Sequence, residues 1–101
     1  MIIYNITVKV EDQIAESWLQ WLLAEHIPDV LLTKCFHNYK VVRLLETDDS
    51  DGPTYAIQYE AHSKSDYNRY IELHAETLRK KSLDKWGGQF IAFRSLMEVV
   101  K

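Results

Sequence analysis

The sequence predicts one α+β domain in which four strands and two helices follow each other in the order β-α-β-β-α-β. Residues 2–10 and 54–61 alternate between two sets of side chains with period two, which indicates half-buried strands. Two other stretches repeat their apolar residues with the helical period of 3.6. A length of 101 residues, 47% of them apolar, suits a single domain over residues 1–101 with a packed core.

The first half of the chain predicts a strand followed by a helix. Residues 2–10 place five apolar side chains on one face, and the helix after them carries an apolar arc from Ile14 to Leu23. Proline disfavours α geometry in the residue before it, so we expect the helix to end or kink at Ile27, before Pro28. A further short turn is expected over residues 29–32.

The second half predicts a hairpin, a second helix and a last strand. Ser63 and Asp66 have capping-box spacing and mark the start of the helix. Its apolar stripe runs to Leu78, and Gly87 with Gly88 stops whatever helix remains near Trp86. The strands are expected over residues 36–47, 54–61 and 89–100, with a hairpin loop over residues 48–53.

This element order is that of the split βαβ, ferredoxin-like fold, an antiparallel four-stranded sheet with both helices on one face. The other face is left open. We expect that face to be too apolar for a solvated surface, which predicts a homodimer formed by two open faces. The residues expected there are Ile3, Asn5, Thr7, Arg43, Leu45, Ala56, Gln58, Phe90, Ala92, Arg94 and Leu96.

Composition and charge exclude several classes of function. The net charge is −3. The one basic run, Arg79 to Lys81, is interpreted as a solvated helix end. Nucleic acid is therefore not expected as a partner. Cys35 is the only cysteine, which excludes an internal disulfide or a cysteine-based zinc site. No apolar run is long enough to cross a membrane, and the N-terminus lacks secretory signal features. We therefore expect a cytoplasmic protein without a metal or cofactor.

The segments MIIYNITVKV, WLQWLLAEHIP, TYAIQY and FIAFRSLMEV follow each other at intervals that resemble a family of small bacterial proteins classed as a domain of unknown function. That family is in turn similar to the dimeric α+β barrel proteins, which include cofactor-free monooxygenases, haem-degrading enzymes, small isomerases and ligand-sensing domains. The resemblance implies dimerisation through the sheet face and a pocket between sheet and helices. It implies no catalytic residue, because none of the active-site motifs of that wider group is matched.

Two histidines are candidates for chemistry. His26 lies within the apolar arc of the first helix, next to the expected pocket, where it would serve as a general base or as a ligand anchor. His74 lies in the apolar stripe of the second helix. For both, the alternative is a core histidine whose ring is satisfied by hydrogen bonds. For His26 a further alternative is a cation that stabilises the C-terminus of the helix.

Polar residues of the strands form a second group of candidates. Arg94, Arg43 and Gln58 are expected to converge on the open face, where two guanidinium groups would bind a carboxylate or another anionic ligand. An ion pair with Glu60 or Glu98 of a second subunit is the alternative. Trp18, Trp21, Tyr55 and Tyr59 either line an apolar pocket or form the core, and we expect Trp18 to be a core residue and not a functional aromatic.

Three functions remain open. The first is a homodimeric domain that binds a small apolar or aromatic ligand with an anionic group. The second is a cofactor-independent enzyme of the monooxygenase or isomerase type, with His26 as base or proton shuttle beside a substrate held by Arg94. The third is a structural or protein-interaction module that only dimerises.

Overall fold

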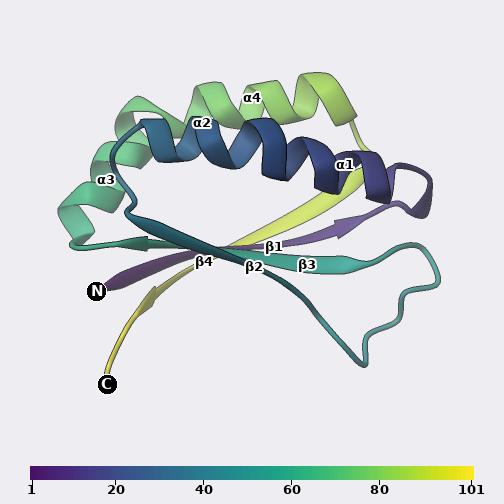
Figure 1. Ribbon diagram of the computed structural model, residues 1–101, viewed down its shortest axis with the longest axis horizontal. Helices are drawn as coiled ribbons and strands as arrows, with labels where there is room; N and C mark the ends of the chain where they lie inside the picture. Colours follow the sequence, from purple (N-terminus) through teal and green to yellow (C-terminus); the bar gives the residue numbers. More distant parts are fainter.

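A computed structural model describes residues 1–101 as one four-stranded antiparallel sheet with all helices on one face (Figure 1). The strand order is β2-β3-β1-β4, and every neighbouring pair is antiparallel. This confirms the ferredoxin-like fold. The strands are β1 (Ile2–Val10), β2 (Asn38–Arg43), β3 (Thr54–Ala61) and β4 (Phe90–Glu98).

The first helical segment continues through Pro28 and does not end at Ile27. After a 3-10 turn (Asp12–Ile14) it consists of α1 (Ala15–Trp21), a π-helical turn (Leu22–His26) and α2 (Ile27–Leu32). In the π turn the Ile27 N–H donates to the Leu22 carbonyl five residues earlier. Proline lacks an N–H, and we infer that the wider turn accommodates its ring and its missing donor. The proline therefore changes the helix type without ending the helix.

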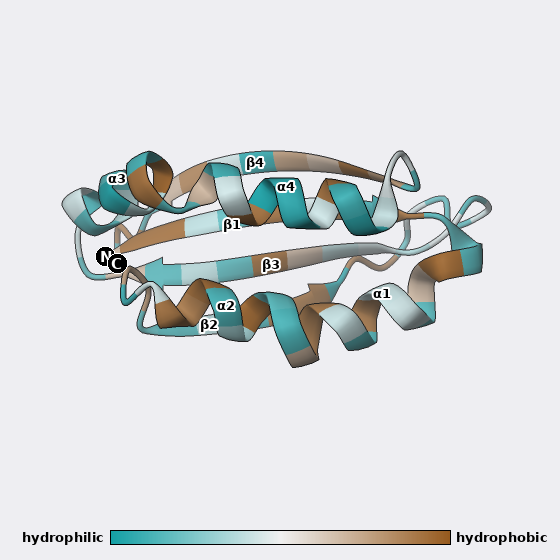
Figure 2. Cartoon of the chain, turned by 90° about the horizontal axis from the view of Figure 1, so that it is seen from above, coloured by the Kyte–Doolittle hydropathy of each residue, from teal (hydrophilic) through white to brown (hydrophobic).

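The second helical segment begins as expected, since the Ser63 hydroxyl accepts a hydrogen bond from the Asp66 N–H at 3.3 Å. It is divided at His74, whose φ of −128° lies outside the helical region. The two parts are α3 (Lys64–Leu73) and α4 (Ala75–Trp86). Seen from above, this segment lies on the β4 side of the sheet and α1–α2 on the β2 side, with β1 and β3 visible between them (Figure 2).

The faces expected for the last strand are wrong. Ala92 pairs with Val8, and Arg94 pairs with Ile6. Side chains of paired residues share a face, so Phe90, Ala92, Arg94 and Leu96 lie on the helix side. The open face instead receives the alternate residues of β4: Ile91, Phe93, Ser95 and Met97.

The second strand is shorter than expected and also differs in its faces. Pairing ends where the Leu44 N–H donates to the Thr54 carbonyl, and Glu46 turns the chain away with a φ of 58°. Leu45 consequently lies outside the sheet. Arg43 pairs with Tyr55 and so shares the helix-side register, although its position on the edge strand leaves its side chain exposed.

One apolar core packs the helices against the sheet. It contains alternate residues of β1 and β3, as the period-two pattern predicts, together with side chains from each helical segment. Trp18 is buried in this core as expected, but it also lines the cavity described below. No helix is long and apolar enough to span a membrane.

Gly52 is expected to be the glycine that is most sensitive to substitution. It has a φ of 146°, and a Cβ built there would lie 1.8 Å from the carbonyl oxygen of Val10. Backbone strain and this clash together should lower the free energy of unfolding of Gly52→Ala by about 3 kcal/mol or more. Chemical denaturation measures this. Gly88→Ala is the control, because a Cβ there meets nothing within 4 Å; equal stability of the two variants would contradict the prediction.

Candidate binding cavity

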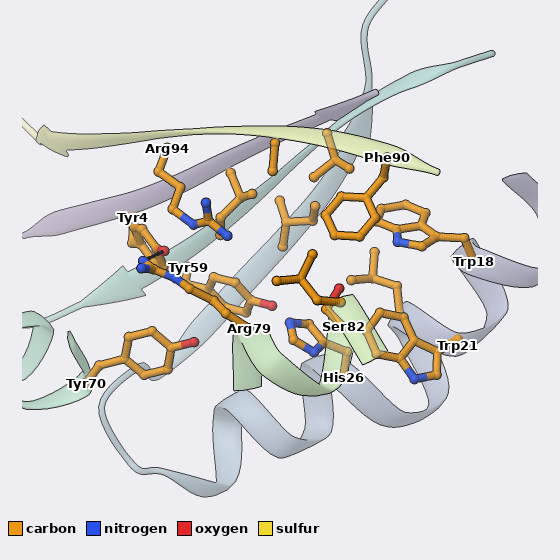
Figure 3. Close-up of a pocket in the computed structure, with 16 residues that line it drawn as sticks. Tyr4, Trp18, Trp21, His26, Tyr59, Tyr70, Arg79, Ser82, Phe90 and Arg94 are labelled. Atoms are coloured by element: carbon orange, nitrogen blue, oxygen red, sulfur yellow. Dashed lines mark hydrogen bonds between the residues drawn. The ribbon is translucent and has the colours of Figure 1, made fainter. Parts of the chain in front are cut away.

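A cavity of about 300 Å³ lies between the helix face of the sheet and the two helical segments. Its lining comes from β1, β3 and β4, from α1 with the π-helical turn, and from α3 and α4. Most of these side chains are apolar, and no aspartate or glutamate lines the cavity. Figure 3 shows its labelled side chains pointing inward from strands and helices. The lining residues are Tyr4, Ile6, Val8, Trp18, Trp21, Leu22, His26, Ile57, Tyr59, Tyr70, Arg79, Ser82, Leu83, Phe90, Ala92 and Arg94.

The two ends of the cavity, which are separated along the strand direction, have different linings. Phe90, Ala92 and Arg94 are successive helix-side residues of β4, so Phe90 and Arg94 are about 13 Å apart along the backbone. Trp18 and Trp21 lie near Phe90, whereas Arg79 reaches toward the end that holds Arg94 (Figure 3). One end is therefore aromatic and the other is cationic.

The cationic end has two guanidinium groups without a carboxylate partner. Arg79 donates to the Tyr4 hydroxyl at 3.0 Å, and its Nε is buried without a hydrogen-bond partner. Arg94 forms none of the salt bridges of the chain. The other two arginines, Arg43 and Arg69, each lie within salt-bridge distance of an aspartate. The cavity thus holds the unpaired arginines.

Two tyrosine hydroxyls add neutral donors at this end. Burial raises the pKa of Tyr59 and of Tyr70, with a further increase from neighbouring tyrosines; the positive charges of Arg79 and Arg94 partly oppose the effect on Tyr70. Both hydroxyls are therefore protonated at neutral pH. Figure 3 shows both pointing into the cavity.

The π-helical turn places His26 beside Trp21. In an α-helix, residues five apart are rotated by about 140° from each other, and their side chains do not meet. In the π turn they lie on the same side, and the two rings stack with centroids 4.9 Å apart and 28° between their planes. The turn therefore directs both rings to one side of the helix, where both line the cavity.

His26 is a neutral base in this environment. Burial lowers its pKa from the usual value, and Lys81 acts in the same direction, while the carboxylate of Asp29 opposes them. A neutral imidazole has one donor nitrogen and one acceptor nitrogen. His26 thus adds to the cavity a group that accepts a proton at neutral pH.

Of the candidates from the sequence, the structure brings His26 and Arg94 to one cavity and leaves three others outside it. Arg43 pairs with Asp49 at 3.0 Å. Gln58 lies on the open face, opposite Asn5 of β1. His74 is half-buried at the junction of α3 and α4. The expected convergence of Arg43, Gln58 and Arg94 on the open face is wrong, because Arg94 and Arg43 have helix-side register.

Sequence reasoning missed Arg79 and Ser82. The basic run from Arg79 to Lys81 is not uniformly solvated, because Arg79 reaches into the cavity while Lys80 pairs with Asp84 on the surface. A signal was present in the helical period, since Ala75, Leu78, Arg79, Ser82 and Trp86 lie on one stripe.

Several solved structures have the same fold as this chain. A variant of SnoaB, a cofactor-independent oxygenase from Streptomyces nogalater, matches with a TM-score of 0.72 at 10% identity, over 99% of this chain and 93% of that one. A dimeric ferredoxin-like protein from an uncultured marine organism matches with 0.72 at 16% identity, over 100% and 96%. A putative antibiotic biosynthesis monooxygenase from Deinococcus radiodurans gives 0.70 at 16% identity, over 100% and 94%. At these identities the likeness shows the ferredoxin-like fold.

A comparison of the sequence with protein families identifies the family of this chain. Residues 1–100 match the family described as Domain of unknown function (DUF4286), and the chain belongs to that family. No curated protein matches the chain significantly.

Proposed function

We propose that the cavity binds a small aromatic acid, with the ring at the aromatic end and the carboxylate between Arg79 and Arg94. The observation that carries this proposal is the pair of guanidinium groups in a cavity without an acidic residue. Guanidinium binds carboxylate with two parallel hydrogen bonds. The unpaired, buried Nε of Arg79 is a donor that such an anion would satisfy.

The aromatic end supports a flat apolar group on the ligand. Trp18, Trp21 and Phe90 line it, and ligand sites combine such apolar surfaces with a few convergent polar groups. A volume of about 300 Å³ lies at the lower end of the usual range for ligand pockets, which favours a ligand with a single small ring system.

A second copy of the chain is the partner proposed for the open sheet face. No helix covers this face (Figure 1), and Ile91 and Phe93 are 59% and 68% exposed there. Apolar patches of this kind mark association surfaces. Asn5 and Gln58 lie on the same face, where a self-complementary interface would pair them. We therefore propose a homodimer. We also propose that the protein is bacterial and cytoplasmic and that it has no nucleic-acid partner. An interaction module without a ligand is the competing function.

A cofactor-independent enzyme is the second candidate function. The observation that favours it is the neutral imidazole of His26 inside the cavity, since general bases are groups of this kind with pKa values near neutrality. SnoaB, which shares the fold, is described as an oxygenase of that type.

Arg94→Gln should weaken binding of an aryl carboxylate about 10- to 100-fold, because the variant removes a charge-assisted hydrogen bond. Calorimetric titration with 3-phenylpropionate measures this, and the uncharged amide of the same skeleton should bind weakly to both proteins. Arg43→Gln is the matched control, since that arginine lies on a strand outside the cavity. Failure of the wild-type protein to bind the carboxylate, or an equal loss in both variants, would contradict the proposal.

A further inference from the structure

His26 lies between the two ends of the cavity. Figure 3 shows its ring pointing into the cavity between the tryptophans and the arginines, with Ser82 of α4 near it. A ligand whose ring lies at one end and whose carboxylate lies at the other would place its connecting carbon atoms near His26.

The donors at the cationic end exceed what one carboxylate uses. Besides the two arginines, the hydroxyls of Tyr59 and Tyr70 point into the cavity at this end (Figure 3). A carboxylate has two oxygens, and buried donors need acceptors. The surplus of hydrogen-bond donors indicates that the ligand carries a second acceptor next to its carboxylate. A carbonyl oxygen is the simplest acceptor at that position.

The ring of His26 also borders a second hollow on the outer side of the helices. That hollow is polar, and it shares only Trp21 and His26 with the inner cavity. Asp29 and Lys81 line it, with their charged groups 3.8 Å apart. The His26 ring takes part in none of the side-chain hydrogen bonds or salt bridges of the chain. Its ring nitrogens are therefore free to take a proton on one side and release it on the other.

We propose that the chain catalyses keto–enol tautomerisation of an aryl 2-oxo acid, with His26 as the catalytic base. This inference rests on the proposed binding of an aromatic acid in the same cavity. The substrate class follows from the aromatic end, the two arginines and the surplus donors. The position of His26 selects the carbon between the ring and the carbonyl group.

The step is a balanced proton transfer. The free imidazole nitrogen takes a proton from the carbon between ring and carbonyl, and the C–H electron pair forms the carbon–carbon double bond. The carbonyl π electrons move to oxygen, which takes a proton from solvent, while His26 returns its proton to solvent through the outer hollow. No oxidant or reductant takes part.

The surroundings of His26 fit both protonation states of such a base. Burial keeps the imidazole neutral before the transfer, and Asp29 on the outer side favours the imidazolium after it. Donors at the cationic end stabilise the negative charge that develops on the carbonyl oxygen, because they are already in place when the charge forms.

Phenylpyruvate in deuterated buffer is the probe. Proton NMR follows exchange of its CH2 hydrogens, and we expect the wild-type protein to accelerate exchange above the rate in buffer. His26→Gln should lower the protein-dependent rate by about 10²- to 10⁴-fold, the usual contribution of a general base, with binding retained by calorimetry. His74→Gln, outside the cavity, should behave as wild type. His26→Asn serves as a second variant if the glutamine disturbs folding.

The outcomes separate the two proposals. Binding of phenylpyruvate without accelerated exchange by the wild-type protein would overturn the tautomerase and leave the binding function intact. Exchange that persists in folded His26 variants would also overturn it. No binding at all would overturn the binding function and the tautomerase together. The exchange and binding measurements on the wild-type protein test both proposals without any variant.

Discussion

Trp18→Ala is expected to lower the free energy of unfolding by about 3–5 kcal/mol, the usual cost of such a truncation in a core. The Trp18 side chain is 3% exposed and stacks on Tyr55 with ring centroids 5.7 Å apart. Because the ring also lines the cavity, its removal joins a new void to an existing one, which leaves little chance of collapse. For a domain of about 100 residues, each kcal/mol shifts the melting temperature by roughly 4–8 °C.

Thermal unfolding monitored by circular dichroism measures this loss. Leu32→Ala is the control, because that leucine is 71% exposed and its truncation should change stability by less than about 0.5 kcal/mol. A melting temperature of Trp18→Ala within a few degrees of the wild type would show that the core between α1 and β3 is not closely packed.

Phe93→Glu should abolish the proposed dimer and leave a monomer. The proposed interface places two copies of Phe93, with Ile91 beside it on β4, in an apolar contact on the open sheet face. A buried carboxylate without a partner there costs several kcal/mol per subunit, enough to abolish association at micromolar concentration. Light scattering with size-exclusion chromatography should give twice the mass of one chain for the wild type and a single chain for the variant.

The matched control for this variant is Leu73→Glu. Leu73 is 66% exposed, about as much as Phe93, but it lies on α3, away from the open face. It should leave the mass unchanged. A monomeric wild type, or a dimer that survives Phe93→Glu, would exclude the open face as the interface.

The sequence predicted the faces of β1 and β3 correctly and those of β4 wrongly, for a physical reason. In β1 one alternate set is entirely apolar, so burial identifies it. In β4 both sets are mainly apolar: Phe90, Ala92 and Leu96 against Ile91, Phe93 and Met97. Only the register with β1, set by tertiary pairing, distinguishes them.

The site was predictable in part for a similar reason. The apolar arc of the first helix indicated that His26 faces inward, and the structure places it in the cavity. The place of Arg79 in the cavity was not predicted, because a run of basic residues resembles a solvated helix end. Its position on the apolar stripe of α4 nevertheless distinguishes it from Lys80. The contact between Arg79 and Tyr4, 75 residues apart, has no local signal.

The π-helical turn also has a meaning for other members of the family. Compared with an α-helical turn, it holds one extra residue between Trp21 and Pro28, and a relative with a deletion there would have an ordinary helix. In such a relative the aromatic ring and the imidazole would separate around the helix axis. The spacing Trp-x4-His-x-Pro is thus a sequence motif. It distinguishes relatives that have this cavity wall from relatives in which the wall differs.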